Sequence, residues 1–111
     1  MEEQPWVIVI SQNGLTEEKN HGDIYQLLNL LDEVERPPVK LYFTTEGVSL
    51  VAAASPILSR LKRLAANGVE MVACRTCLDY MGLRDQVQVG QVWAMEHIMT
   101  DMERTANVVL L

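Results

Sequence analysis

Cysteine is scarce in this sequence, and two residues in 111 are too few for a disulfide scaffold. Positive charge is scarce as well: nine lysines and arginines stand against fifteen aspartates and glutamates, for a net charge of -6. An acidic chain without a basic stripe is poorly suited to bind nucleic acid or a membrane surface. No apolar run approaches the roughly 20 residues of a membrane span, and the acidic start, Met1-Glu2-Glu3-Gln4, lacks the positive charge of a signal peptide. We therefore expect a cytoplasmic protein that has neither nucleic acid nor membrane as a partner.

Signatures of common cofactors are also missing. Gly14 follows the first apolar run, but no Gly-x-Gly-x-x-Gly or P-loop pattern accompanies it. A structural zinc needs four ligands, and besides the two cysteines the candidates are His21 and His97, far apart in sequence. No Ser-His-Asp or paired-carboxylate arrangement stands out. We expect no bound cofactor and no metal.

Apolar residues make up 49% of the chain, enough for the core of one domain over residues 1–111. Runs typical of strands cover residues 6–10, 39–43, 69–73 and 107–111, with a shorter candidate at 87–89. Helical spacing of apolar residues predicts helices over 23–34 and 55–66, one turn over 78–81, and a later helix with its apolar face from Val92 to Met102. Residues 44–54 are ambiguous, and 48–54 are compatible with a short helix. This alternation predicts an α/β fold in which a mostly parallel sheet of about five strands is covered on both faces.

Several residues mark where these helices begin and end. Asp23 can cap the first helix, and Pro37-Pro38 stops it. Ser55-Pro56 predicts the start of the second helix, with the capping residue before a first-turn proline, and Asn67-Gly68 predicts its end. Residues 15–22, which are mostly polar, predict an exposed loop.

The last predicted helix has a face rich in methionine, formed by Met95, Met99 and Met102. Such a stripe is more often core packing than a surface for a hydrophobic partner. Trp93 falls beside this face, where it is either an interface anchor or a partly covered surface residue. His97 fits a surface or capping role, and nothing marks it as a catalytic base.

Both cysteines lie where an α/β sheet places its chemistry, at the carboxyl end of a strand. Cys74 ends the predicted third strand, and Cys77 lies near the start of the following helical turn. Helix-terminal amides and the positive charge of Arg75 would lower a thiol pKa, whereas a nearby Asp79 would raise it. Two thiols three residues apart can form a disulfide or resolve a persulfide. The alternative is that Cys74 is a small buried hydrophobe that closes the strand.

The segment over residues 69–83 resembles the DsrE-like domain of YedF-type proteins, which are called sulfurtransferase-like and are associated with selenium metabolism. The typical pattern is a strand, then Cys-Gly-Thr-Cys-Leu-Asp-Tyr-Tyr-Gly-Leu, then a Val-Gly-Glu-Val run, which Val89-Gly90-Gln91-Val92 matches closely. The helix over Ser55 to Gly68 is similar as well. Resemblance to the broader DsrE/DsrF and TusD-like group implies a three-layer α/β/α domain and homo- or hetero-oligomers such as dimers, trimers or hexamers. It also implies that Cys74, just after the third strand, carries a persulfide, with Cys77 as the second cysteine of the YedF-type pattern.

Two departures of this sequence from the family's pattern matter most. Arg75 replaces the usual glycine, and the first loop, Gln12 to Gly22, lacks the glycine-rich pattern of YedF-type domains. YedF-type proteins usually carry an additional TusA-like domain, for which 111 residues leave no room, so we expect a stand-alone DsrE-like domain.

The resulting hypothesis is a sulfur or selenium carrier that works between a donor and an acceptor protein and is sulfurtransferase-like if active. In it Cys74 holds the persulfide, Cys77 resolves or tunes it, and Arg75, Thr76 and Asp79 shape the site. One alternative is a non-catalytic assembly subunit in which Cys74 is inert and the methionine face makes subunit contacts together with Trp93. Another is a redox-sensing dithiol with a Cys74–Cys77 disulfide.

Overall fold

The computed structural model describes residues 5–12, 23–105 and 107–111. Their five strands form one sheet, entirely parallel, in the order β4-β3-β2-β1-β5. The strands are β1 (Trp6–Ile10), β2 (Lys40–Phe43), β3 (Glu70–Cys74), β4 (Gln91–Trp93) and β5 (Asn107–Leu110). The α-helices are α1 (Asp23–Leu31), α2 (Leu58–Ala66), α3 (Arg75–Tyr80) and α4 (Met95–Glu103), and two 3-10 helices are η1 (Thr45–Val51) and η2 (Arg84–Gln86).

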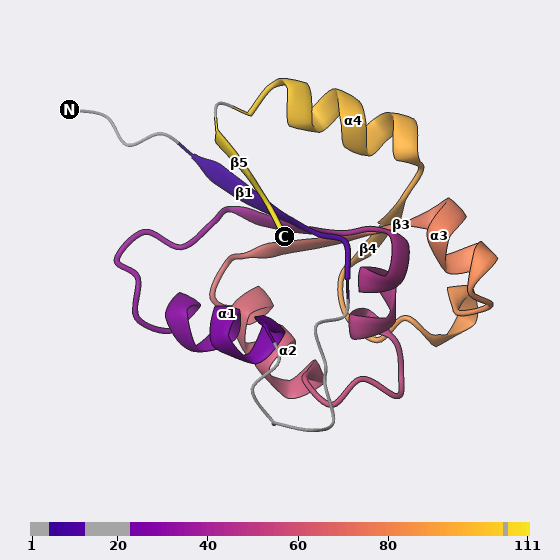
Figure 1. Ribbon diagram of the computed structural model, residues 1–111, viewed down its shortest axis with the longest axis horizontal. Helices are drawn as coiled ribbons and strands as arrows, with labels where there is room; N and C mark the ends of the chain where they lie inside the picture. The colour runs from indigo at the N-terminus through magenta and orange to yellow at the C-terminus, as the bar shows by residue number, and fades with distance from the viewer. Residues whose placement is uncertain (1–4, 13–22, 106) are drawn as a thin grey trace.

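Helices cover both faces of this sheet. In Figure 1, α1 and α2 lie on one side, α4 lies on the other, and α3 lies where β3 ends. The strand order explains this division, because crossovers between parallel strands are right-handed. The chain moves steadily in one direction from β1 to β3, which keeps α1 and α2 on one face, and then returns from β4 to the far edge at β5, which places α4 on the other. The predicted three-layer α/β/α fold is confirmed.

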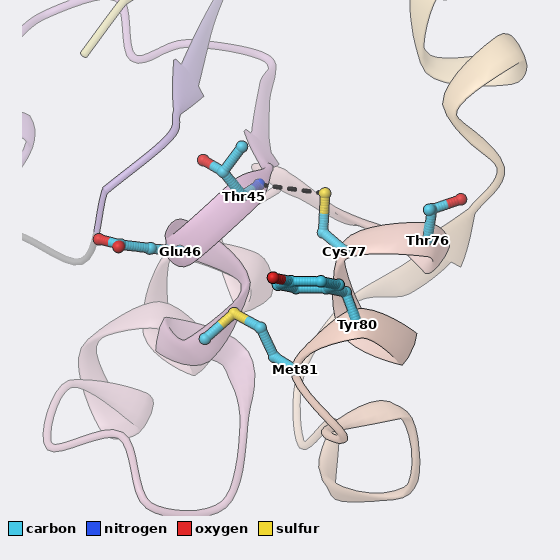
Figure 2. Close-up of a pocket in the computed structure, with 6 residues that line it drawn as sticks. All are labelled: Thr45, Glu46, Thr76, Cys77, Tyr80 and Met81. Carbon is cyan, nitrogen blue, oxygen red and sulfur yellow. Dashed lines mark hydrogen bonds between the residues drawn. The ribbon is translucent and has the colours of Figure 1, made fainter.

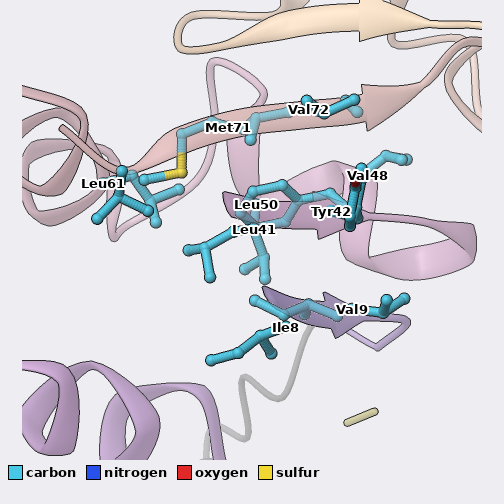
Figure 3. Packing of buried hydrophobic residues seen from close by; sticks show 14 of the residues in the cluster. Ile8, Val9, Leu41, Tyr42, Val48, Leu50, Leu61, Met71 and Val72 are labelled. Carbon is cyan, nitrogen blue, oxygen red and sulfur yellow. The ribbon is translucent and has the colours of Figure 1, made fainter. Parts of the chain in front are cut away.

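The core lies along the three central strands. From Val7 to Ile10, all residues of β1 are buried, as expected for a continuous apolar strand in a parallel sheet. Ile8, Leu41 and Met71 are paired across β1, β2 and β3, and with Leu61 of α2 they belong to one buried cluster (Figure 3). These strands therefore hold the carboxyl edge of the sheet in place.

The predicted helix boundaries were right for some ends and wrong for others. Asn67-Gly68 does end α2: Gly68 has φ 103, and the N–H of Val69 donates to Leu64 at 3.1 Å, as in a glycine-capped terminus. The regular part of α2 begins only at Leu58, and the Ser55 hydroxyl accepts from the N–H of Ile57 at 3.3 Å in the turn before it. The regular part of α1 ends at Leu31, three residues before the predicted end. The predicted loop 15–22, with His21, lies outside the described residues, as do Gly14 and the Asp23 side chain.

Two further predictions need correction, one for the residues before β4 and one for the residues after β2. Residues 87–89 are not a strand, and only Val87 makes an isolated antiparallel bridge, to Ala52. The chain turns at Gly90, where φ is 87 and an added Cβ would lie 2.7 Å from the carbonyl oxygen of Met71, so regular pairing with β3 starts after it. Val92, predicted on a helix, consequently lies in β4.

The second correction concerns the ambiguous segment after β2. A helix forms there, as suggested, but it is the 3-10 helix η1, which begins at Thr45, three residues before the suggested start at residue 48, and ends at Val51. Gly47 allows η1 to pack tightly against the end of β1, because a Cβ at this position would lie 2.2 Å from the carbonyl oxygen of Ile10. This close approach brings the start of η1 to the carboxyl edge.

The face of α4 is mainly core packing, as the methionine pattern suggested. Ile98 is fully buried, and Met95 and Met102 pack against the core, whereas Met99 is 57% exposed. Trp93 is half-buried and stacks on the exposed ring of His97 with 4.0 Å between ring centroids. Most of the surface proposed for subunit contacts is therefore used within the chain.

Charged side chains also join α4 to the sheet. The Asp101 carboxylate accepts hydrogen bonds from Lys40 Nζ, at 2.6 Å, and from the Tyr42 hydroxyl. Lys40 also lies 3.3 Å from a Glu70 oxygen and 4.8 Å from the centroid of the Trp93 ring. The hydrogen bonds from Lys40 and Tyr42 lower the pKa of Asp101, while burial and the bond to Asp101 raise the pKa of Tyr42. The carboxylate thus anchors α4 in its ionised form.

Candidate functional site

Cys74 is the last residue of β3 and is completely buried. It pairs with Trp93 of β4, and α3 begins immediately after it at Arg75. The predicted single turn over 78–81 is therefore wrong in its start, since residues 75–77 are already helical. The burial of Cys74 matches the interpretation of a small hydrophobe at the end of a strand.

Cys77 is the cysteine that opens to a cavity. It lies in the first turn of α3, is half-buried, and its side chain faces the space between α3 and η1 (Figure 2). The cavity measures about 420 Å³ and is lined by Thr45, Glu46, Thr76, Cys77, Tyr80 and Met81. Both cysteines are free thiols.

The backbone of Thr45 makes a polar contact with this thiol. Its N–H donates a hydrogen bond of 3.2 Å to the Cys77 sulfur (Figure 2). Thr45 has φ 46, a left-handed conformation that is rare for a β-branched residue. The Thr45 hydroxyl holds it there, with its one proton shared between the carbonyl oxygens of Ser11 and Thr44. Such conformations concentrate at functional sites, where surrounding contacts maintain them.

The environment of Cys77 favours the neutral thiol. Burial and, next, the neighbouring Cys74 thiol raise the pKa of Cys77 above its ordinary value, and the N–H of Thr45 opposes this shift without cancelling it. The sequence had suggested a lowered thiol pKa at this edge. The difference arises because α3 is short and Arg75 is exposed to solvent, so burial outweighs the favourable charges.

The three residues predicted to tune the site differ in their positions. Thr76 lines the cavity, although its side chain is exposed. Asp79 forms a bidentate ion pair with Arg84, with oxygen–nitrogen distances of 2.6 and 2.8 Å. The hydrogen bonds from Arg84, aided by the charges of Arg84 and Arg75, lower the pKa of Asp79. The charge of Asp79 is therefore compensated outside the cavity.

Sequence reasoning missed four cavity residues. Tyr80 and Met81 lie in the segment 69–83 that carries the family resemblance, but the sequence offered no reason to assign them a role; they are 91% and 40% exposed and make one wall strongly apolar. Glu46 is the one charged residue among the six that line the cavity. Thr45 acts through its backbone, which no side-chain pattern reveals; the only signal was that the pattern of residues 44–54 was ambiguous.

A family comparison matches almost the whole chain. The model of the DsrE/DsrF-like family covers residues 7–109. This chain belongs to that family. The likeness to YedF-type proteins in particular stays a prediction.

Solved structures share the fold of this DsrE/DsrF-like protein. One is MTH1491 from Methanobacterium thermoautotrophicum, a protein of unknown function, with 19% identity, a TM-score of 0.72, and coverage of 98% of this chain and 100% of that one. Another is the ychN protein from E. coli, with 12% identity, a TM-score of 0.72, and coverage of 97% and 100%. No curated protein matches this sequence.

Within residues 5–12, 23–105 and 107–111, no three histidine, cysteine, aspartate or glutamate side chains come together in a way that could hold a metal ion. Among the same residues, no helix has both the length and the apolar character needed to span a membrane.

Proposed function

We propose that this protein carries a sulfane sulfur as a cysteine persulfide, and that Cys77, rather than the predicted Cys74, holds it. The observation that carries this choice is the position of the Cys77 sulfur, which faces the cavity and accepts a hydrogen bond from Thr45. Cys74 has no exposed surface on which a donor could act. Membership of the DsrE/DsrF-like family supports a role of the sulfur-relay type.

The transfer to Cys77 begins from a neutral thiol. A donor protein presents a persulfide anion, and the Cys77 sulfur, as it gives up its proton, attacks the terminal sulfur of the donor. The donor S–S bond breaks, a new S–S bond forms on Cys77, and the donor sulfur leaves as a thiol with the proton lost from Cys77. The charge of the site changes by the one negative charge that arrives with the sulfur. The Thr45 N–H is placed to stabilise this charge, since hydrogen bonds to anions are stronger than those between neutral groups.

In this proposal Cys74 is the auxiliary thiol. It lies next to Cys77 and helps to keep the Cys77 thiol protonated until a donor arrives. The carrier would work in the cytoplasm, where thiols stay reduced, between a donor and an acceptor protein. The apolar wall of Tyr80 and Met81 gives these partners a surface around the sulfur.

Labelling by a cysteine desulfurase tests the assignment. The reduced protein is incubated with the desulfurase and cysteine labelled with radioactive sulfur, and the bound label is counted before and after treatment with dithiothreitol. We expect wild type and Cys74→Ser to take up reducible label and Cys77→Ser to take up none. If only Cys74→Ser loses the label, the carrier is Cys74. If both single variants load as well as wild type, the persulfide proposal is wrong.

A second candidate is a non-catalytic assembly subunit. It is favoured by the complete burial of Cys74 and by the raised pKa of Cys77, since reactive cysteines usually have lowered pKa values. This candidate predicts that wild type takes up no label from any desulfurase, while the protein still forms a stable complex with other subunits. The redox-sensing alternative predicts instead a Cys74–Cys77 disulfide after exposure to oxidised glutathione, seen by mass spectrometry as the loss of two free thiols.

A further inference from the structure

The two cysteine thiols contact each other but have different surroundings. Cys74 is the N-cap residue of α3, just before its first turn, and Cys77 is the third residue of that helix. Side chains at these two positions lie over the same turn, as in a capping box, and the Cys74 side chain makes no capping hydrogen bond of its own. Burial is the largest cause of the raised pKa of Cys77, and a hydrogen bond with the Cys74 thiol is the next. The buried thiol therefore has the Cys77 sulfur as its reaction partner.

A persulfide on Cys77 would present its two sulfur atoms to different groups. Cys77 lines the cavity between α3 and η1, whereas Cys74 does not line it and is fully buried. The cavity is the space into which the Cys77 side chain faces (Figure 2), so the outer sulfur of a persulfide extends into it. The inner sulfur stays beside Cys74. Molecules from solution therefore meet the outer sulfur, and Cys74 meets the inner one.

We infer that Cys74 discharges a persulfide on Cys77 by attacking its inner sulfur, which releases the outer sulfur as hydrosulfide. The inference rests on the sulfur-carrier proposal, because the step starts from a loaded Cys77. The bond between the inner and outer sulfur breaks, a Cys74–Cys77 disulfide forms, and the Cys74 proton leaves on the hydrosulfide. The outer sulfur gains two electrons, one from each cysteine sulfur, so no external oxidant takes part. A dithiol reductant then returns both cysteines to free thiols.

The surroundings of Cys74 favour attack on the inner sulfur. Attack on the outer sulfur would move that atom onto Cys74, which belongs to the buried core cluster. A close-packed core has no space for an added sulfur atom. Attack on the inner sulfur instead sends the leaving hydrosulfide into the cavity, from which it can escape. The reaction is also intramolecular, so it needs no encounter between molecules.

The loaded protein thus has two competing outcomes. An acceptor thiol that enters the cavity takes the outer sulfur and leaves Cys77 reduced. When no acceptor arrives, Cys74 releases the same sulfur as hydrosulfide, and the disulfide prevents further loading because Cys77 is no longer a free thiol. Cys74 therefore limits the lifetime of the persulfide, and loading resumes only after reduction.

A single loading of the reduced protein without oxygen tests this step. A cysteine desulfurase transfers labelled sulfur, the desulfurase and free cysteine are removed, hydrosulfide is trapped with monobromobimane, and the intact mass is followed. Wild type should change from one sulfur atom heavier to two hydrogen atoms lighter, with one labelled hydrosulfide for each disulfide. Cys74→Ala and Cys74→Ser should keep the persulfide at least about tenfold longer.

Two control variants accompany this experiment. Val72→Ala is a buried change on β3 that keeps both thiols, so it should discharge like wild type. Cys77→Ser cannot be loaded at the proposed position, so it measures the hydrosulfide that the desulfurase releases by itself.

Cyanide is an acceptor small enough to enter the cavity, and it removes the outer sulfur of a persulfide as thiocyanate. Added to wild type immediately after loading, it should yield thiocyanate and leave both cysteines as free thiols. Added late, it should yield almost none, because the sulfur has already left as hydrosulfide. Cys74→Ala should yield thiocyanate at both times.

The outcomes separate this inference from the carrier proposal. A wild type that keeps its persulfide as long as Cys74→Ala would overturn the inference and leave the carrier proposal standing. Hydrosulfide without a disulfide, or a disulfide without hydrosulfide, would overturn it as well. If the Cys74 variants take up no sulfur on Cys77, the carrier proposal fails and the inference fails with it.

Discussion

The reactivity of the two thiols toward an alkylating reagent provides a direct test of the site. Only the thiolate reacts, and the pKa of Cys77 lies above its ordinary value of 9.0. Most Cys77 is therefore neutral at pH 7, and below its pKa the ionised fraction of any acid rises by up to about tenfold for each pH unit. We expect the alkylation rate of Cys77 to rise by the same factor without a plateau below pH 9. Cys74, which is fully buried, should be modified only when the protein unfolds.

The assay is a pulse of iodoacetamide at a series of pH values, followed by digestion and mass spectrometry of the peptide that contains both cysteines. Cys77→Ser and Cys74→Ser variants identify which thiol reacts. The unfolded protein in guanidinium is the control, because there both thiols are open to solvent and should react alike. A Cys77 rate that levels off below pH 8, or a Cys74 that reacts first in the folded protein, would refute our account of the site.

Two substitutions test contacts that hold α4 and η1 against the sheet. Asp101→Asn removes the carboxylate that anchors α4, and it should lower the free energy of unfolding in urea by about 2 kcal/mol at pH 7. Because the pKa of Asp101 is lowered in the fold, this stabilisation is complete above the ordinary pKa of 3.8 and is lost as the pH falls through the lowered pKa. The difference in stability between Asp101→Asn and wild type should therefore shrink in acid. Asp79→Asn, which removes a carboxylate from an exposed ion pair, should have a much smaller effect on the free energy of unfolding. Gly47→Ala places a Cβ 2.2 Å from the carbonyl oxygen of Ile10, and it should lower the melting temperature more than Gly68→Ala, which meets open space and only an unfavourable φ. Equal melting temperatures for the two glycine variants would contradict the close packing of η1.

The central strands could be predicted because each is a continuous apolar run, a pattern that few other local structures share. Residues 6–10, 39–43 and 69–73 coincide with β1, β2 and β3 to within one residue. The fourth strand could not be found in this way, since β4 has three residues and its start is set by the contact of Gly90 with the backbone of Met71. That contact is between residues distant in sequence and leaves no local pattern.

The candidate site was predicted in its location and not in its arrangement. Both cysteines were expected at the carboxyl edge of β3, where they lie. Their different exposure depends on where η1 packs, because η1 forms the opposite wall of the cavity into which Cys77 faces. The hydrogen bond from Thr45 depends on the same packing and on the left-handed backbone conformation of Thr45. A threonine rarely adopts this conformation, so the sequence does not suggest it.

The sequence alone determined the α/β architecture and the segment that holds the chemistry, because apolar periodicity and the Cys-x-x-Cys spacing are local properties of the chain. Only the tertiary structure decided which thiol meets solvent, that its pKa is raised, and that β5 lies at the edge of the sheet. Each of these depends on which surfaces other parts of the chain cover: β3 ends with Cys74 inside the core, η1 leaves Cys77 facing a cavity, and the return of the chain from β4 puts β5 outside. Burial sets both the cost of ionising a thiol and the free energy of exposing an apolar strand, and burial is settled by residues far apart in sequence.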